Sequence, residues 1–138
     1  MAKQLSDHPT LEELNGFFGH DRFAEHAGCR IVEGSRDHAV CELDIQDHHR
    51  NALGNVMGGV IFTLADFALA IASNTGGNPS VSVSSTIEYL SASKGTRLIA
   101  TCNADKSGRR LGFYTTDVTD DTGRRIARVA ATVFRESE

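Results

Sequence analysis

Between Arg50 and Glu88 the chain carries one formally charged side chain, that of Asp66. A segment in contact with water rarely runs so long without charge, because charged side chains are the ones that folded proteins keep at the surface. We therefore expect buried structure here, with a carboxylate that must be paired, hydrogen-bonded or protonated once it loses water. The apolar run within it, residues 60–72, is shorter than the roughly 20 residues of a membrane-spanning helix.

Length and composition are typical of a single domain over residues 1–138, with a helical N-terminal segment over residues 1–25. The chain is 40% hydrophobic and 23% charged, both close to the averages for globular proteins. Because 14 Lys and Arg face 18 Asp and Glu, the formal net charge is −4. That balance, without basic blocks, argues against nucleic acid or a membrane surface as a partner.

Cysteine usage and the N-terminus predict a cytoplasmic protein. The cysteines are odd in number, widely spread and free of CxxC pairs, which is typical of unpaired thiols in a reducing compartment: Cys29, Cys41 and Cys102. Residues 1–9 contain no apolar run that could form the core of a signal peptide.

Apolar periodicity predicts two helices. The first opens at Pro9-Thr10 and ends near Gly19. The second runs from Gly59 to about Ser73, where an apolar stripe recurs at helical spacing: Ile61, Leu64, Ala65, Ala68 and Ile71. Its other side consists almost entirely of small residues, which lets another backbone or a ligand come close: Gly59, Thr63, Asp66, Ala70 and Ser73.

The remaining chain is typical of strands. A first strand region follows His26, and five further segments alternate apolar and polar residues or lie between turn residues: 39–45, 81–90, 96–105, 111–119 and 124–135. Residues 47–51 form a polar loop in which we expect His48 and His49 to be exposed rather than to bind metal. The order of elements predicts an α+β fold in which an antiparallel sheet packs against the central helix.

Asp66 has two interpretations. A carboxylate on an apolar helix can act as a nucleophile or general base in a ligand cleft. It can equally be a structural group that caps a neighbouring segment or faces a subunit interface.

Residues 51–59 bring glycines into the start of the central helix. Free backbone N–H groups at such an N-terminus can bind a phosphate or stabilise a developing oxyanion. The segment is neither a Walker A loop nor a dinucleotide fingerprint, because no Lys-Ser/Thr and no GxGxxG pattern is present. The alternative is a turn whose glycines serve tight packing. A serine-hydrolase elbow, GxSxG, is absent.

Residues 51–66, Asn-Ala-Leu-Gly-Asn-Val-Met-Gly-Gly-Val-Ile-Phe-Thr-Leu-Ala-Asp, resemble the signature of hotdog-fold acyl-CoA thioesterases, in the branch of the PaaI-like phenylacetate-pathway enzymes. The resemblance continues through residues 80–83 and 89–91 and covers the chain from about Asp44 onward. It implies the hotdog fold, in which an antiparallel sheet wraps around one long helix, and homodimers that share active sites and pair into tetramers.

The resemblance also implies roles for individual residues. Asp66 attacks the thioester carbonyl or activates water, the Gly58 N–H stabilises the oxyanion, Asn51 orients water or the carboxylate, and Ser82 lies near Asp66. Coenzyme A is held by two strand-turn segments and the adjoining glycine, and the basic residues among these are expected to cluster: Gly59, Tyr89, Leu90, Ser91, Lys94, Lys106, Arg109 and Arg110. The acyl pocket is expected to be apolar and lined in part by Phe62, Leu53 or Met57.

The predicted function is hydrolysis of acyl-CoA thioesters with a small, aromatic or medium-chain acyl group. No cofactor or metal is expected, because coenzyme A is part of the substrate. Met57 stands where many relatives have His, and a thioether donates no hydrogen bond. A non-catalytic acyl-CoA-binding protein is therefore the alternative. A hotdog dehydratase is disfavoured because the helix offers no His beside its acid, and a purely structural dimer leaves the motif unused.

Overall fold

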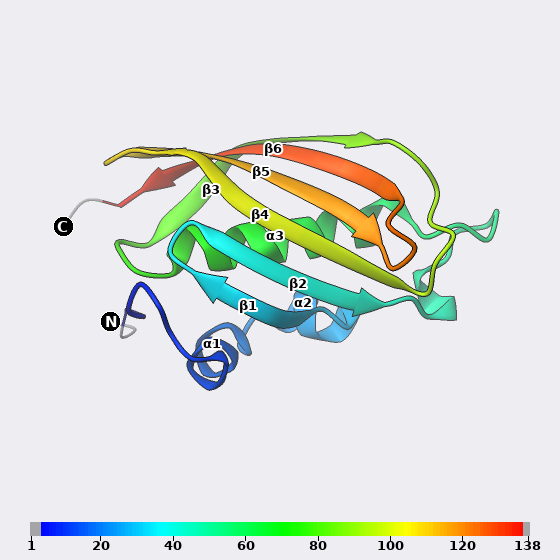
Figure 1. The fold of residues 1–138 in the computed structure, drawn as a ribbon, viewed down its shortest axis with the longest axis horizontal. Helices are drawn as coiled ribbons and strands as arrows, with labels where there is room; N and C mark the ends of the chain where they lie inside the picture. The colour runs from blue at the N-terminus through cyan, green and yellow to red at the C-terminus, as the bar shows by residue number, and fades with distance from the viewer. Residues whose placement is uncertain (1–3, 137–138) are drawn as a thin grey trace.

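The fold is one antiparallel sheet curved around a long helix, as the computed structural model in Figure 1 shows. The structure describes residues 4–136, so residues 1–3 of the expected N-terminal segment lie outside it. The helices are α1 (Leu11–Phe18), α2 (Arg22–Ala27), the 3-10 helix η1 (Asp47–His49) and α3 (Gly58–Asn74). The strands are β1 (Arg30–Ser35), β2 (His38–Asp44), β3 (Ser80–Tyr89), β4 (Arg97–Ser107), β5 (Leu111–Asp120) and β6 (Arg125–Arg135).

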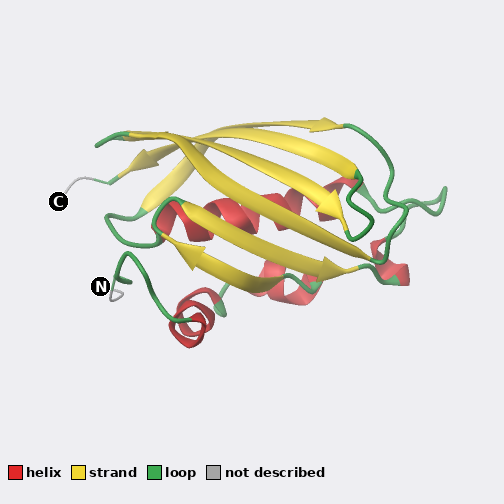
Figure 2. Cartoon of the chain, in the orientation of Figure 1, coloured by secondary structure: helices red, strands yellow, loops and turns green. Residues whose placement is uncertain are grey.

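The six strands follow the order β1-β2-β4-β5-β6-β3, and every neighbouring pair is antiparallel. The predicted α+β arrangement is therefore observed, with α3 against the concave face of the sheet (Figure 2). Strands β1 and β3 are the two edges. Edge strands offer unpaired backbone groups to any further strand that approaches them.

Helix α3 supplies the centre of the core. Its predicted apolar stripe is buried along its whole length, and Leu64, Ala68 and Ile71 have no exposed surface at all. Complete burial of each larger side chain of this kind stabilises the fold by about 1.5 to 3 kcal/mol. The helix is therefore fixed in position against β2, β4 and β5. The residues at its N-terminus and in its middle are fixed with it.

The N-terminal helices differ in how far the sequence predicts them. Helix α1 begins and ends as expected, because Thr10 and Glu13 form a capping box at its start. Helix α2, which packs on α3, begins within the expected helical segment over residues 1–25 and ends at residues 26–27, where the sequence predicted the approach to a strand. It buries Ala24 alone, too little for an apolar stripe, and ends at Gly28 with φ 97°.

His49 corrects the prediction of two exposed histidines, which holds only for His48. The His49 ring is 3% exposed. Its Nδ1 accepts a hydrogen bond from the Gln46 N–H (2.9 Å), and its Nε2 donates to the Ala27 carbonyl oxygen (2.7 Å). The ring therefore ties the end of α2 to the loop that leads into α3.

Strand β3 is exposed on both faces. Val81, Val83 and Tyr89 each keep more than half of their surface accessible: 55%, 59% and 54%. These three residues of the expected apolar face are therefore not buried in the single chain, whereas Ile87 on the same strand is partly buried against the core. The strand also carries an irregularity between Ser82 and Ser84 in its pairing with β6.

Within residues 4–136, no helix is long and apolar enough to span a membrane. All three cysteines are unpaired, as expected, and Cys41 and Cys102 are fully buried.

Candidate active site

The loop before α3 is organised by Asn51. Its Oδ1 accepts hydrogen bonds from the Leu53 N–H (3.0 Å) and the Asn55 N–H (3.1 Å). Its backbone N–H donates to the Asn55 carbonyl (2.7 Å), and a bridge between Arg50 and Val56 closes the loop. No hydrogen bond in the described part of the chain uses the Asn51 Nδ2, so this donor is available to a bound water or ligand.

The first turn of α3 presents two free donors. Met57, at the N-cap, makes no side-chain hydrogen bond to the helix, and the Val60 N–H bonds back to the Met57 carbonyl (3.0 Å). The N–H groups of Gly58 and Gly59 have no acceptor among residues 4–136. Because the helix dipole adds positive potential here, the two glycines form a site for an anionic or polarised oxygen.

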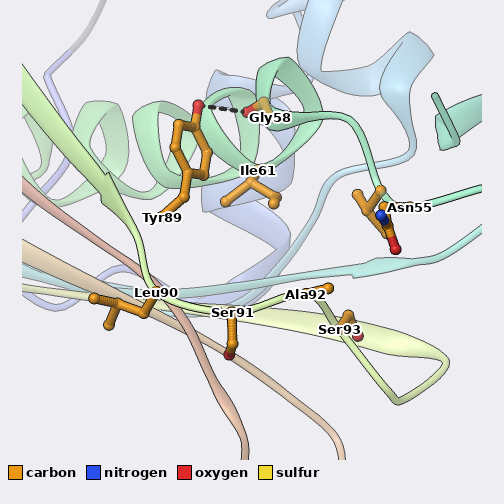
Figure 3. A pocket seen from close by; sticks show the side chains of 9 residues that line it. Asn55, Gly58, Ile61, Tyr89, Leu90, Ser91, Ala92 and Ser93 are labelled. Atoms are coloured by element: carbon orange, nitrogen blue, oxygen red, sulfur yellow. Dashed lines mark hydrogen bonds between the residues drawn. The ribbon is translucent and has the colours of Figure 1, made fainter. Parts of the chain in front are cut away.

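A pocket of about 420 Å³ lies beside this turn (Figure 3). It is lined by residues of the loop and α3 on one side and of the chain after β3 on the other: Asn55, Val56, Gly58, Ile61, Tyr89, Leu90, Ser91, Ala92 and Ser93. The Tyr89 hydroxyl donates to the Gly58 carbonyl oxygen (3.0 Å). A Cβ on Gly58 would lie 2.9 Å from that hydroxyl, so the close approach of Tyr89 requires glycine.

The far wall of this pocket is anchored by Asp120, which is 1% exposed. Its carboxylate accepts hydrogen bonds from Ser93, the Lys94 and Gly95 N–H groups, Thr122 and the Arg124 N–H. Desolvation opposes the charged form, but the hydrogen bonds outweigh it and hold the pKa of Asp120 far below its ordinary value. The wall after β3 is thus fixed by a single carboxylate from β5.

Asp66 lies eight residues after Gly58 on the same helix, which corresponds to about 12 Å along the helix axis. It is exposed in the single chain, which corrects the expectation of a buried acid. Its carboxylate lines a second pocket, of about 250 Å³, between α2 and α3. Partial desolvation, and then the negative charge of Asp21, raise the pKa of Asp66 above its ordinary value.

The predicted catalytic residues are therefore not brought together within one chain. Asn51 and Gly58 lie at one end of α3, and Asp66 lies in its middle. Ser82 is exposed near the start of β3, and no hydrogen bond in the described part of the chain joins it to Asp66. About 12 Å is too far for Asp66 and the Gly58 N–H to act on the same carbonyl group.

The expected basic cluster is wrong for the single chain. Lys94 precedes β4, whereas Lys106 lies near its end, about 30 Å away at the rise of an extended strand. Arg109 and Arg110, in the following turn, lie near the C-terminal end of α3, because Arg135 bonds to the carbonyls of both Gly108 and Ser73. The remaining predicted coenzyme A residues lie near the N-terminal end of α3. They line the 420 Å³ pocket or are adjacent in sequence to residues that line it: Gly59, Tyr89, Leu90, Ser91 and Lys94.

Two residues of the Asp66 pocket, Asp21 and Phe23, were not singled out in the sequence. Asp21 is the N-cap of α2 and Phe23 lies in its first turn, and the six residues of this helix carry no helical stripe. The available signal was Gly28, which permits the left-handed conformation that ends this helix. Phe62, which was predicted to line the acyl pocket, lines this pocket, whereas Leu53 and Met57 do not. Among residues 4–136 no group of three His, Cys, Asp or Glu side chains could hold a metal ion.

Comparison with known proteins identifies the family. The sequence profile described as the thioesterase superfamily matches residues 53–137. Acyl-coenzyme A thioesterase 13 of Mus musculus is 33% identical over 114 residues, which cover 80% of each chain. The crystal structure of a hypothetical thioesterase protein with coenzyme A, from Streptococcus pneumoniae, superposes with a TM-score of 0.80 at 27% identity, covering 90% of this chain and 98% of that one.

The structure of the Escherichia coli PaaI protein gives a TM-score of 0.85 at 24% identity, covering 91% of this chain and 92% of that one. This likeness establishes the hotdog fold that the sequence motif implies. The resemblance stated from residues 51–66 is confirmed, since the profile match and the relatives point to the same family. The chain belongs to the thioesterase superfamily, a family of hotdog-fold enzymes.

Proposed function

We propose that the protein hydrolyses acyl-CoA thioesters to a free acid and coenzyme A. The observation that carries the proposal is the pair of N–H groups on Gly58 and Gly59, which have no acceptor in the described part of the chain and lie at the start of a helix beside a pocket. Such donors stabilise the oxyanion that forms when a thioester carbonyl is attacked. The mouse thioesterase and the coenzyme A-bound neighbour support this substrate class.

Asp66 drives the reaction in this proposal, as a nucleophile or as the base that takes a proton from water. Attack places negative charge on the carbonyl oxygen, which accepts a hydrogen bond from the Gly58 N–H. The C–S bond then breaks, and the thiolate of coenzyme A leaves and gains a proton that comes from the attacking water through Asp66. Where Asp66 is itself the nucleophile, the acyl-Asp66 anhydride that forms is hydrolysed by water, which releases the free acid and supplies the proton. The free Asn51 Nδ2 orients the water or the carboxylate, and Ser82 helps to place water near Asp66.

The active site is shared between two chains in this proposal. The separation of Gly58 and Asp66 on one helix supports it, because a second copy must supply the missing partner group. Strand β3, exposed on both faces, offers an edge on which an identical β3 can pair in antiparallel fashion. The oxyanion donors then come from one subunit and Asp66 from the other.

In this proposal the same pairing of two β3 strands brings together basic residues that lie far apart within one chain. The turn with Arg109 and Arg110 lies near the start of β3, since Leu111 pairs with Phe134 and Phe134 with Val81. Antiparallel pairing of two β3 strands brings the start of one next to the end of the other. Lys94 of one subunit and the partner's Lys106, Arg109 and Arg110 can then hold the phosphates of one coenzyme A, beside Gly59, Tyr89, Leu90 and Ser91.

Pairs of dimers complete the assembly we propose. Val81, Leu111 and Phe134 are adjacent across three strands and are 55%, 43% and 38% exposed. This apolar surface supports packing of one dimer against another.

The reaction needs no cofactor beyond the coenzyme A of the substrate, and the three unpaired thiols suit the reducing cytoplasm.

A panel of acyl-CoA esters, assayed for released thiol, tests the function. We expect turnover by the wild type and a loss of about 100-fold or more in Asp66→Asn, the lower range for removal of a catalytic base. The matched control is Asp117→Asn, an exposed carboxylate on β5 that lines neither pocket, and it should turn over normally. Saturable acyl-CoA binding without thiol release would instead identify a non-catalytic binding protein.

A further inference from the structure

The pocket beside Asp66 lies between two helices and is lined by aromatic side chains. Phe62 and Phe67 come from α3, and Phe23, which is 75% exposed, comes from α2. The pocket holds about 250 Å³, which corresponds to roughly eight groups of the size of a water molecule. It is therefore suited to a short acyl group.

The charged groups that line this pocket are Asp66 and Asp21. The Asp21 carboxylate makes no hydrogen bond or ion pair within residues 4–136, and its side chain does not cap α2. It is thus an unpaired negative charge on the wall that faces Asp66.

The neighbouring cations do not neutralise Asp21. The guanidinium of Arg30 is held by Asp44 (2.8 Å) and Glu42 (3.0 Å). Arg22, next to Asp21 in the chain, lies 3.8 Å from Glu25, and both of these side chains are well exposed. An acyl group entering the pocket therefore meets negative charge on both sides.

We propose that Asp21 is a specificity-determining residue, which makes the pocket between α2 and α3 accept uncharged acyl groups and reject those that carry a carboxylate. This inference rests on the proposed thioesterase function and adds to it the acyl selectivity of the site. A carboxylate in the acyl group would lie close to Asp21 and Asp66 without a cation, and like charges in a partly desolvated site repel strongly. Specificity here comes from the repulsive contact.

The test compares hexanoyl-CoA with adipoyl-CoA, which has the same number of acyl carbons and a terminal carboxylate. We expect the wild type to favour hexanoyl-CoA in kcat/KM. Asp21→Asn should reduce that preference about tenfold, the effect of removing one close charge in a partly desolvated pocket, and Asp21→Lys should reduce it further. Asp21→Asn leaves the fold intact, because the side chain makes no cap bond.

Glu25→Gln is the matched control, since it removes the same charge four residues later, within α2, at a position that does not line the pocket. Its preference should equal that of the wild type. An unchanged preference in both Asp21 variants would overturn the inference, as would a wild type that favours adipoyl-CoA. Failure of the proposed function is distinct, because the wild type would then release thiol from neither ester.

Discussion

The Tyr89 hydroxyl donates a hydrogen bond of 3.0 Å to the carbonyl oxygen of Gly58, which ties the end of β3 to the first turn of α3. The bond occupies the carbonyl of Gly58 and leaves its N–H free. The hydrogen bond thereby fixes the edge strand β3 relative to the N–H groups at the start of α3, at the border of the 420 Å³ pocket.

Gly58→Ala is expected to lower kcat/KM about tenfold or more with little loss of stability. The new Cβ would lie 2.9 Å from the Tyr89 hydroxyl, so the exposed tyrosine side chain must rotate into the pocket or away from it. Kinetics with a short acyl-CoA and thermal unfolding measure the two effects. Gly58→Ala should cost less activity in a Tyr89→Ala background than in the wild type, whereas an equal cost in both backgrounds would show that the clash is not the cause.

The pH dependence of kcat/KM should have an acidic limb above the ordinary pKa of an aspartate. Desolvation and the charge of Asp21 raise the pKa of Asp66, and Asp66 works as a carboxylate, so activity falls as the pH drops through that raised value. Asp21→Asn removes one of the two causes and should move the limb to lower pH. A limb that stays in place would show that another group controls it.

Asp120→Asn should destabilise the protein by about 2 to 4 kcal/mol, because an amide cannot accept the full set of hydrogen bonds at this buried position. Urea unfolding at neutral pH measures the loss. The pKa of Asp120 is lowered in the folded state, so its stabilisation is present above the ordinary aspartate pKa and is lost as the pH falls below it. The difference between wild type and Asp120→Asn should therefore shrink in acid.

Val83→Lys should convert the proposed dimer into monomers and abolish turnover together with assembly. Val83 is 59% exposed on β3, so the charge costs the single chain little but opposes pairing of two identical edges. Sedimentation equilibrium and the thiol assay report the two properties. Lys at Val32, which is 40% exposed on the other edge strand, is the matched control and should leave both unchanged.

Local patterns predicted the elements that form the core. The apolar stripe from Ile61 to Ile71 predicted α3 to within one residue at each end, and Thr10 with Gly19 bounded α1. Alternation and glycine turns predicted the strands of the sheet. These signals lie within a few residues of the elements they specify, so the sequence alone can display them.

Other features depend on contacts between distant segments. His49 is buried because it reaches the Ala27 carbonyl, and β3 is exposed because β6 places it at an edge. The basic residues on either side of β4 are separated by the length of the strand, although they looked like one cluster in the sequence. The Asp66 pocket required α2, a helix too short to show a period.

The most direct test of the central claim mixes two inactive variants, Asp66→Asn and Asn51→Ala, after denaturing and refolding them together. If the donors of one subunit act with Asp66 of the other, half of the dimers are mixed and each contains one intact site. Roughly a quarter of the wild-type activity should then return, as the symmetry of a homodimer dictates. Activity that stays at the level of the separate variants would show that the site does not combine Asn51 and Gly58 of one chain with Asp66 of another.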